Sequence, residues 1–337
     1  MADRSKIEWT DATWNPVQAF HVEDGNVGWH CEKVSPACRY CYAEAHNGRR
    51  LPNGGTGLPY DRASRDLVLS GVDPYTLLKP FAWKRRRKIF VCSMTDLFGD
   101  WVTVEEIARV WAIMYEAQWH TFQVLTKRAT RMAQVLNRPD FRALVADAAH
   151  EIALKRSPEI EGVVTRADAY DDICDLWPLQ NVWLGVTAED DKWANARIPA
   201  LLSCPAVTRW VSYEPALGPI NWKRFSGLNW IVFGGESGSK ARPPHPQWAK
   251  DTRDYCVERG IAFYLKQWGT WQPANHGTLR SKAPTCRIDT SGRDVTDLPG
   301  LWDEADEYLY RVGKVQAGRR LSGREWSQFP EVPANAV

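Results

Sequence analysis

The stretch Asn181-Val-Trp-Leu-Gly-Val-Thr187 is an almost continuous apolar run that ends in a polar residue. A run of this kind is typical of a strand that is buried on both faces, as the strands of a parallel sheet are. These properties recur along the chain and predict a mainly parallel sheet. The other runs of this type lie at 88–96, 121–127, 206–214, 228–236 and 261–266.

Amphipathic segments lie between several of these runs and predict helices at 104–117, 192–202 and 248–259. The first of them starts with a capping box, because Thr103 is followed three residues later by Glu106. Strands that alternate with helices form βαβ units, and we expect one further strand before the first cysteine. The sequence therefore predicts an α/β fold, a partial or complete parallel β/α barrel of the TIM-like kind. A doubly wound open sheet is the alternative.

Two parts of the chain interrupt the alternation of strands and helices. The segment 143–179 is acidic and rich in alanine, which predicts a partly helical insertion. The residues after Gly269 carry many turn formers and little periodicity, which predicts a small appendage. We therefore expect the barrel in residues 1–270, interrupted by that insertion, and the appendage in residues 271–337.

Charge and hydropathy limit the class of protein. The 43 basic and 41 acidic residues give a net charge of +2, which by itself does not argue for nucleic-acid binding. The basic run 84–88 is compatible with phosphate contacts and equally with a solvated surface. The chain has no apolar run of about 18 residues, so we expect no membrane association. The N-terminus lacks the apolar core of a secretion signal, which predicts a cytoplasmic location.

Polar residues follow the predicted strands at their carboxyl ends, where α/β barrels carry their active sites. This regular placement favours an enzyme. We interpret these residues as binding groups, so the sequence predicts no particular catalytic residue. The glycines of the turn 234–238 could cradle part of a ligand, or could simply let a strand enter a helix. The predicted binding residues are Ser93, Thr95, Asp96, Lys127, Glu189, Glu214, Gly234, Gly235, Glu236, Arg242 and Lys266.

Three of the eight cysteines, Cys31, Cys38 and Cys41, follow the spacing C-x(6)-C-x(2)-C. Three thiolates on one loop can hold three irons of a [4Fe–4S] cluster and leave the fourth iron open to a cofactor. A structural zinc site is the alternative, with a fourth ligand from one of the nearby histidines. A trio without metal is also possible. The histidines in reach along the chain are His21, His30 and His46.

Tyr40, directly before the last cysteine, resembles the aromatic residue in the C-x(3)-C-x-aromatic-C signature of radical S-adenosylmethionine enzymes, where the ring lies beside the adenine. The first spacing differs, with six residues here in place of three. Further segments resemble the phage and prophage three-Cys-motif proteins, a family of radical S-adenosylmethionine-like proteins often encoded beside a three-Cys-motif partner protein. These segments are 7–16, 31–44, 93–98, 125–128, 181–186, 214–219, 234–238, 241–246 and 266–269.

The resemblance implies a [4Fe–4S] cluster on the three cysteines and S-adenosylmethionine as the second cofactor. It implies an enzyme that generates a 5′-deoxyadenosyl radical with a flavodoxin- or ferredoxin-type electron donor, in a bacterial or phage-infected cell. A nucleobase, nucleoside or DNA is then a plausible substrate, and a three-Cys-motif protein a plausible partner. The alternative from another class is a zinc-stabilised nucleic-acid-binding protein without catalysis. The strand-end carboxylates argue against that alternative, because they would repel phosphate.

Overall fold

The computed structural model describes residues 4–49, 54–156, 165–274, 285–298 and 303–331. Its centre is a seven-stranded parallel sheet whose strands follow one another in chain order. This order confirms a partial β/α barrel and differs from the doubly wound alternative, in which the strand order reverses. The strands are β1 (Ala12–Trp14), β5 (Lys88–Val91), β6 (Thr121–Thr126), β7 (Val182–Thr187), β8 (Thr208–Tyr213), β9 (Trp230–Gly234) and β10 (Ala262–Gln267).

The strand β5 ends earlier than the apolar run 88–96. Cys92 has a φ of 55°, a left-handed conformation that cannot continue a strand. The next residues therefore turn at the carboxyl end of β5. Ser93, Thr95 and Asp96 lie on this turn, beside the end of the sheet.

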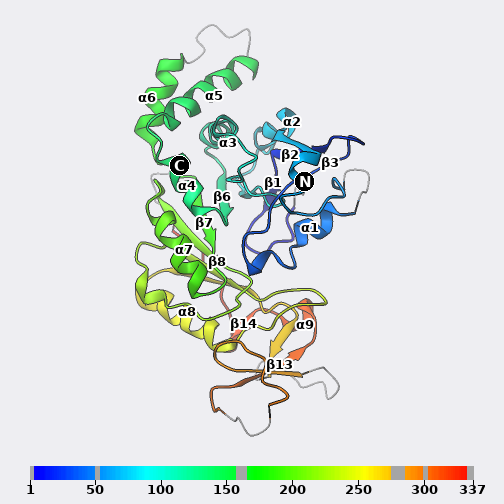
Figure 1. The fold of residues 1–337 in the computed structure, drawn as a ribbon. Coiled ribbons are helices and arrows are strands. Elements are labelled where there is room, and N and C mark those ends of the chain that lie inside the picture. The colour runs from blue at the N-terminus through cyan, green and yellow to red at the C-terminus, as the bar shows by residue number, and fades with distance from the viewer. Residues whose placement is uncertain (1–3, 50–53, 157–164, 275–284, 299–302, 332–337) are drawn as a thin grey trace.

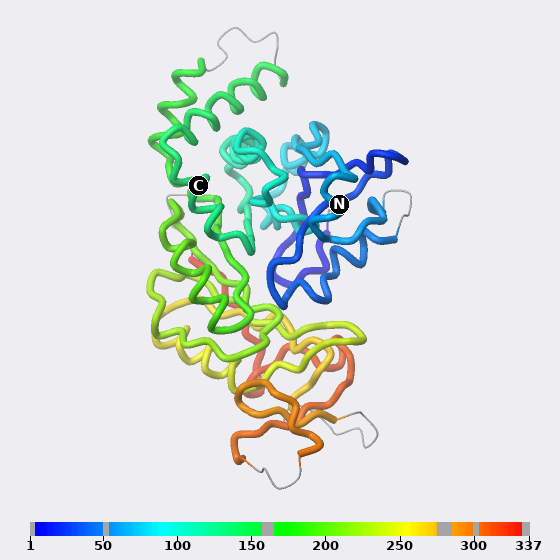
Figure 2. Tube along the Cα trace, in the orientation of Figure 1, coloured from blue at the N-terminus to red at the C-terminus, as the bar shows by residue number. Residues whose placement is uncertain are grey.

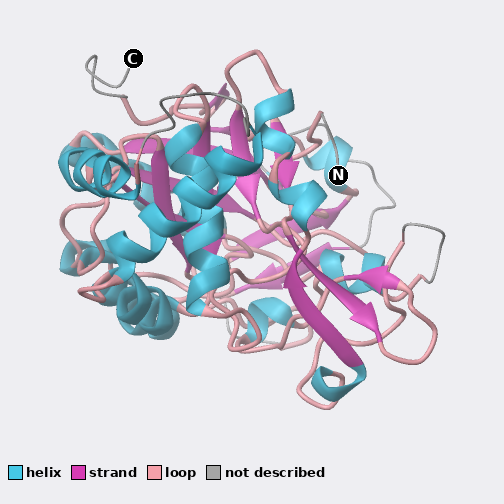
Figure 3. Cartoon of the chain, turned by 90° about the horizontal axis from the view of Figure 1, so that it is seen from above, coloured by secondary structure: helices cyan, strands magenta, loops and turns pink. Residues whose placement is uncertain are grey.

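Helices cover the outer face of the half-barrel. The predicted helices are present as α3 (Val104–Glu116), α7 (Asp191–Leu202) and α8 (Pro246–Arg259), and α4 (Ala129–Leu136) follows β6. The capping box of α3 is confirmed, because Thr103 and Glu106 each accept a hydrogen bond from the other's backbone nitrogen. Figure 3 shows the helices grouped along one side of the strands, so the other face of the sheet is the inside of the half-barrel.

Aromatic side chains fill the inside of the half-barrel, which accounts for part of the unusual content of 18 tryptophans. Gly185 on β7 makes room for them, since a Cβ atom there would lie 2.4 Å from the Trp210 ring. Trp9, from the N-terminal segment, packs against this group and closes it. The buried inner layer consists of Trp9, Phe90, Trp183, Trp210, Trp230, Val232 and Tyr264.

Two helices occupy the segment predicted as an insertion. They are α5 (Phe141–Arg156) and α6 (Arg166–Leu176), and they pack against each other. α5 also packs against α3, which connects the pair to the barrel. Figure 1 shows the pair extending beyond the end of the sheet.

The C-terminal part forms an antiparallel sheet of β11 (Trp271–Pro273), β13 (Glu307–Arg311) and β12 (Thr285–Ile288), followed by α9 (Lys314–Ala317) and the hairpin of β14 (Arg320–Leu321) and β15 (Arg324–Glu325). The chain then returns to the barrel. Trp326 packs against Phe263 of β10, and Phe329 packs against Trp230 inside the half-barrel. Figure 2 shows this last red segment running back behind the green part of the molecule. The C-terminal part therefore also completes the barrel.

A small antiparallel sheet of β3 (Val27–Gly28), β2 (Val17–His21) and β4 (Val68–Val72) lies between β1 and β5 along the chain. The segment between β3 and β4 carries the three cysteines, the short helix η1 (Pro36–Cys38) and α1 (Tyr42–Asn47). The remaining short helices are η2 (Arg65–Leu67), α2 (Pro74–Leu77), η3 (Lys79–Ala82) and η4 (Trp222–Arg224). None of the helices in the described ranges has the length and apolar character needed to cross a membrane.

Candidate active site

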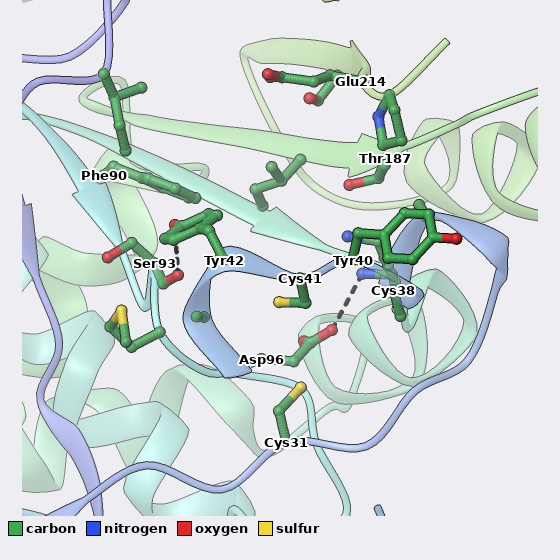
Figure 4. Close-up of a pocket in the computed structure, with 18 of the residues that line it drawn as sticks. Cys31, Cys38, Tyr40, Cys41, Tyr42, Phe90, Ser93, Asp96, Thr187 and Glu214 are labelled. Carbon is green, nitrogen blue, oxygen red and sulfur yellow. Dashed lines mark hydrogen bonds between the residues drawn. The ribbon is translucent and has the colours of Figure 1, made fainter. Parts of the chain in front are cut away.

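A cavity of about 470 Å³ lies where the cysteine-bearing segment meets the carboxyl ends of the barrel strands. Its volume is in the range of ordinary ligand pockets. All three cysteines line it, and so do most of the predicted binding residues (Figure 4). Those in the cavity wall are Tyr40, Ser93, Thr95, Asp96, Lys127, Glu214, Gly235, Glu236 and Lys266, whereas Glu189, Gly234 and Arg242 lie outside it.

The three cysteines come from one short segment, which we call the cysteine loop (residues 31–41). Cys31 follows β3, Cys38 ends η1, and Cys41 is the N-cap residue of α1. Each thiol is half-buried and free of disulfides. The loop therefore presents three thiols to the same cavity.

Two arginines fix the cysteine loop to opposite parts of the barrel. Arg128, at the end of β6, forms an ion pair with Asp96 at 3.1 Å and donates a hydrogen bond to the Glu32 carbonyl at 3.2 Å. Arg242, after β9, pairs with Glu236 at 2.5 Å and donates to the Pro36 carbonyl at 3.1 Å. Each arginine thus ties one carbonyl of the loop to one strand-end carboxylate.

The turn after β5 forms three further hydrogen bonds with residues that precede and follow the cysteine loop. The Thr95 hydroxyl donates to the carbonyl of His30, the residue before Cys31, at 2.5 Å. Tyr42 donates to the Ser93 carbonyl at 2.7 Å, and Tyr60 donates to the Met94 carbonyl at 2.6 Å. The cysteine loop and the residues on either side of it are therefore held against the ends of β5, β6 and β9 together.

Each strand-end carboxylate that the sequence singled out is paired with a cation. Besides the two arginine pairs, Glu214 contacts Lys266 at 2.7 Å across the cavity wall. Glu189 contacts Arg197 at 2.9 Å, and both side chains are fully buried behind the wall. Glu189 therefore belongs to the packing between β7 and α7 in this structure. The pairs leave no uncompensated carboxylate among these four residues.

Close packing explains why glycine occupies the end of β9. A Cβ atom on Gly234 would lie 2.9 Å from the Glu214 carboxyl carbon, and one on Gly235 would lie 2.1 Å from the Trp268 carbonyl oxygen. The turn therefore requires glycine so that β9 can approach its neighbours. The turn does not lead directly into a helix, because α8 begins at Pro246, and Gly235 also lines the cavity, so a ligand-binding role for the turn stays a prediction.

Burial controls the protonation of Cys31. Burial, with a smaller contribution from the negative charge of Asp96, raises the pKa of the Cys31 thiol to about 12, although the Arg128 guanidinium acts in the opposite direction. The described residues contain no group of three or more His, Cys, Asp and Glu side chains gathered closely enough to hold a metal ion. A bound cation would stabilise thiolates and draw the three sulfur atoms together. The donor set suits a thiophilic metal or cluster and is not preassembled.

The histidines near the cysteines do not join them. His21 contacts Asp24 at 2.8 Å, His30 packs edge-on against Trp101, and His46 packs near Trp29. None of the three lies in the cavity wall. The zinc alternative therefore lacks a histidine beside the thiols in the part of the chain that the structure describes.

Several site residues were missed at the level of sequence. Tyr42 and Tyr60 have no sequence signal beyond their proximity to the cysteines, since their hydrogen-bond partners lie 51 and 34 residues away along the chain. The N-terminal residues Lys6 and Trp9 line the cavity through a packing that only the folded chain creates.

Comparisons with known proteins place the chain in a family without assigning it a reaction. No curated protein and no solved structure matches the chain. A family match extends over residues 4–330, which includes the half-barrel, the cysteine loop and most of the C-terminal part. The chain belongs to the family described as "Protein of unknown function (DUF5131)".

Proposed function

We propose that this chain is an iron–sulfur enzyme of the radical S-adenosylmethionine type, with Cys31, Cys38 and Cys41 as the ligands of a [4Fe–4S] cluster. The observation that carries the proposal is that three free thiols of one loop line a cavity at the carboxyl ends of a parallel half-barrel. When bound and reduced by a flavodoxin- or ferredoxin-type donor, such a cluster supplies one electron that cleaves the sulfonium bond of S-adenosylmethionine and yields a 5′-deoxyadenosyl radical.

The protein's own residues would orient the cofactors and exclude water. Arg128 and Arg242 fix the cysteine loop against the strand ends. The Tyr40 ring lies in the cavity wall with the Arg242 guanidinium 5.3 Å from its centre, which suits it to lie beside a purine. Trp9 and Phe90 form an apolar part of the wall, which limits the water that could quench a radical.

The ion pairs of the wall agree with this type of chemistry. Hydrogen-atom transfer needs few acid–base groups, and each of these carboxylates already contacts a cationic side chain. Glu214 and Lys266 therefore act as hydrogen-bonding groups for a ligand in this proposal, with Asp96 and Glu236 as supports for the loop.

Anaerobic reconstitution with iron and sulfide tests the proposal. We expect about four irons per chain and a brown protein. Cys31→Ala, Cys38→Ala and Cys41→Ala should each lose most of the iron, whereas Cys204→Ala, in the core far along the chain, should retain it. Addition of S-adenosylmethionine and a reductant should then release 5′-deoxyadenosine.

Two outcomes would reject the proposal. One is stoichiometric zinc in a colourless protein that takes up no iron under these conditions. The other is iron uptake that survives replacement of all three cysteines. If the reconstituted protein holds its cluster but does not cleave S-adenosylmethionine, the cluster assignment stands and S-adenosylmethionine is rejected as the cofactor.

A further inference from the structure

Two lysines of the cavity wall have no acidic partner. Each acidic side chain of the wall has a basic partner, which gives the pairs Glu8–Lys314, Glu32–Arg65, Asp96–Arg128, Glu214–Lys266 and Glu236–Arg242. Two lining cations remain, Lys6 and Lys127. In the described ranges no carboxylate lies within ion-pair distance of either amino group. Because Glu32 and Glu236 pair with arginines that lie outside the wall, the five acidic and five basic residues of the wall leave Lys6 and Lys127 without a counter-charge.

The proposed cofactor does not account for these two lysines. S-adenosylmethionine carries a carboxylate, an ammonium and a sulfonium group, so it brings no net negative charge to the cavity. A phosphate monoester carries about −1.5 to −2 charges at neutral pH and three acceptor oxygens. Lysine is a common phosphate-binding residue, which acts as a point charge with three donors. A lysine of the wall without a counter-charge therefore suits such a group.

The same cavity offers aromatic surface for a planar ring. Tyr42 keeps 59% of its surface accessible, and its hydroxyl is tied to the Ser93 carbonyl at 2.7 Å, so the ring is held in place. Phe90 lines the cavity close by (Figure 4). Aromatic side chains fixed in this way stack on nucleobases with a contribution of about 1–3 kcal/mol per base. The Tyr40 ring remains for the adenine of the cofactor.

We infer that the substrate of this site is a nucleoside phosphate, free or as part of a strand, with its phosphate on Lys127 and its base against Tyr42 and Phe90. The reaction that this substrate would undergo rests on the function proposed above. The identity of the ligand rests on the unpaired lysine and on the aromatic side chains of the wall. Lys127, one of the binding residues predicted from the sequence, is thereby assigned to the substrate.

Binding to the full-length protein tests the inference, by calorimetry at two salt concentrations with cluster content measured on the same samples. The probes are adenosine and guanosine monophosphates, the matching nucleosides, inorganic phosphate and a short single-stranded oligonucleotide. We expect the monophosphates to bind more tightly than the nucleosides and to weaken as salt rises. Lys127→Ala should weaken monophosphate binding roughly tenfold to a hundredfold, and Lys127→Arg should restore much of it. Lys223→Ala, an exposed cation outside the cavity, should have no effect.

The outcomes separate the two proposals. The inference would be overturned if nucleosides and monophosphates bound equally tightly, or if Lys127→Ala weakened monophosphate binding no more than Lys223→Ala does. If the cluster were intact in the same samples, the proposed function would still stand. Phosphate-dependent binding in a protein that never takes up iron would support the inference and reject the proposed chemistry. Tighter binding of the oligonucleotide, sensitive to Lys127→Ala, would identify a nucleic-acid strand as the source of the phosphate.

Discussion

The two arginines that hold the cysteine loop each satisfy three requirements at once. Arg128 neutralises Asp96, donates to the Glu32 carbonyl and lies over the Trp101 ring at 4.6 Å. A guanidinium can do this because it carries five donors in a fixed plane, which an ammonium group lacks. Asp96 in turn accepts from the Thr126 hydroxyl and the Lys127 backbone, so the pair orders the turn that carries the cavity.

This pair leads to a prediction about stability. Arg128 and Asp96 expose only 11% and 10% of their side chains, so Arg128→Gln leaves a nearly buried carboxylate without a cation. We expect that variant to lose about 3–5 kcal/mol of unfolding free energy. The double variant Asp96→Asn, Arg128→Gln should lose less, because no uncompensated charge remains. Urea unfolding of the metal-free protein measures the unfolding free energy of both variants. A double variant that loses as much as Arg128→Gln or more would contradict the expected coupling between the two side chains.

The thiol of Cys31 leads to a prediction about pH. Its pKa in the folded protein is raised to about 12, from an ordinary value of 9.0, mainly by burial. The neutral thiol therefore stabilises the metal-free fold fully below pH 9, and this stabilisation is lost as the pH rises towards 12, because the unfolded chain ionises first. Cys31→Ser should make the unfolding free energy fall less steeply between pH 9 and 12. Parallel curves for the two proteins would show that Cys31 does not titrate in this way.

At the scale of elements, the strands were predictable and the contacts between them were not. The runs that became β7 and β9 are buried at every position, so hydrophobicity alone identifies them. The small sheet was missed because β3 has two residues and β2 alternates between buried and exposed positions over five. The bond from Arg242 to Pro36 spans 206 residues. No local sequence pattern can predict such a contact.

The fit between β7 and β8 can be tested with one methyl group. Gly185→Ala would place a Cβ atom 2.4 Å from the Trp210 ring, and that ring is enclosed by other aromatics. Overpacking of this kind typically costs about 1–3 kcal/mol of unfolding free energy. Gly48→Ala is the matched control, because its Cβ would meet the Glu44 carbonyl at an ordinary 3.5 Å. Chemical denaturation should separate the two variants, and equal stability would mean that the tryptophan layer can shift at no cost.

At the scale of the whole molecule, the cavity is built by nearly the full length of the chain. Its wall runs from Lys6 to Lys314, and the ion pair between Glu8 and Lys314 joins the two ends at 2.8 Å. The strand-end rule predicted most of the polar wall, because parallel strands bring their carboxyl ends to one edge. It could not predict the contributions of the N-terminal and C-terminal segments, which depend on how these segments close the open side of a half-barrel.

The closing segment at residues 326–329 gives the last prediction. Its backbone pairs with the edge of β10, since Leu265 donates to the Trp326 carbonyl and Gln328 donates to the Phe263 carbonyl. A chain that stops after Ser322 would expose this strand edge together with the apolar side chains beneath it, and such edges promote aggregation. We expect that truncation to yield mostly insoluble protein, whereas a chain that stops after Glu331 keeps every one of these contacts and should behave like the full chain. Trp326→Ala, which removes a buried aromatic and leaves the backbone pairing, should stay soluble and lose about 3–5 kcal/mol. A soluble, monomeric product of the shorter chain, observed by size-exclusion chromatography, would mean that the half-barrel is stable with its edge open.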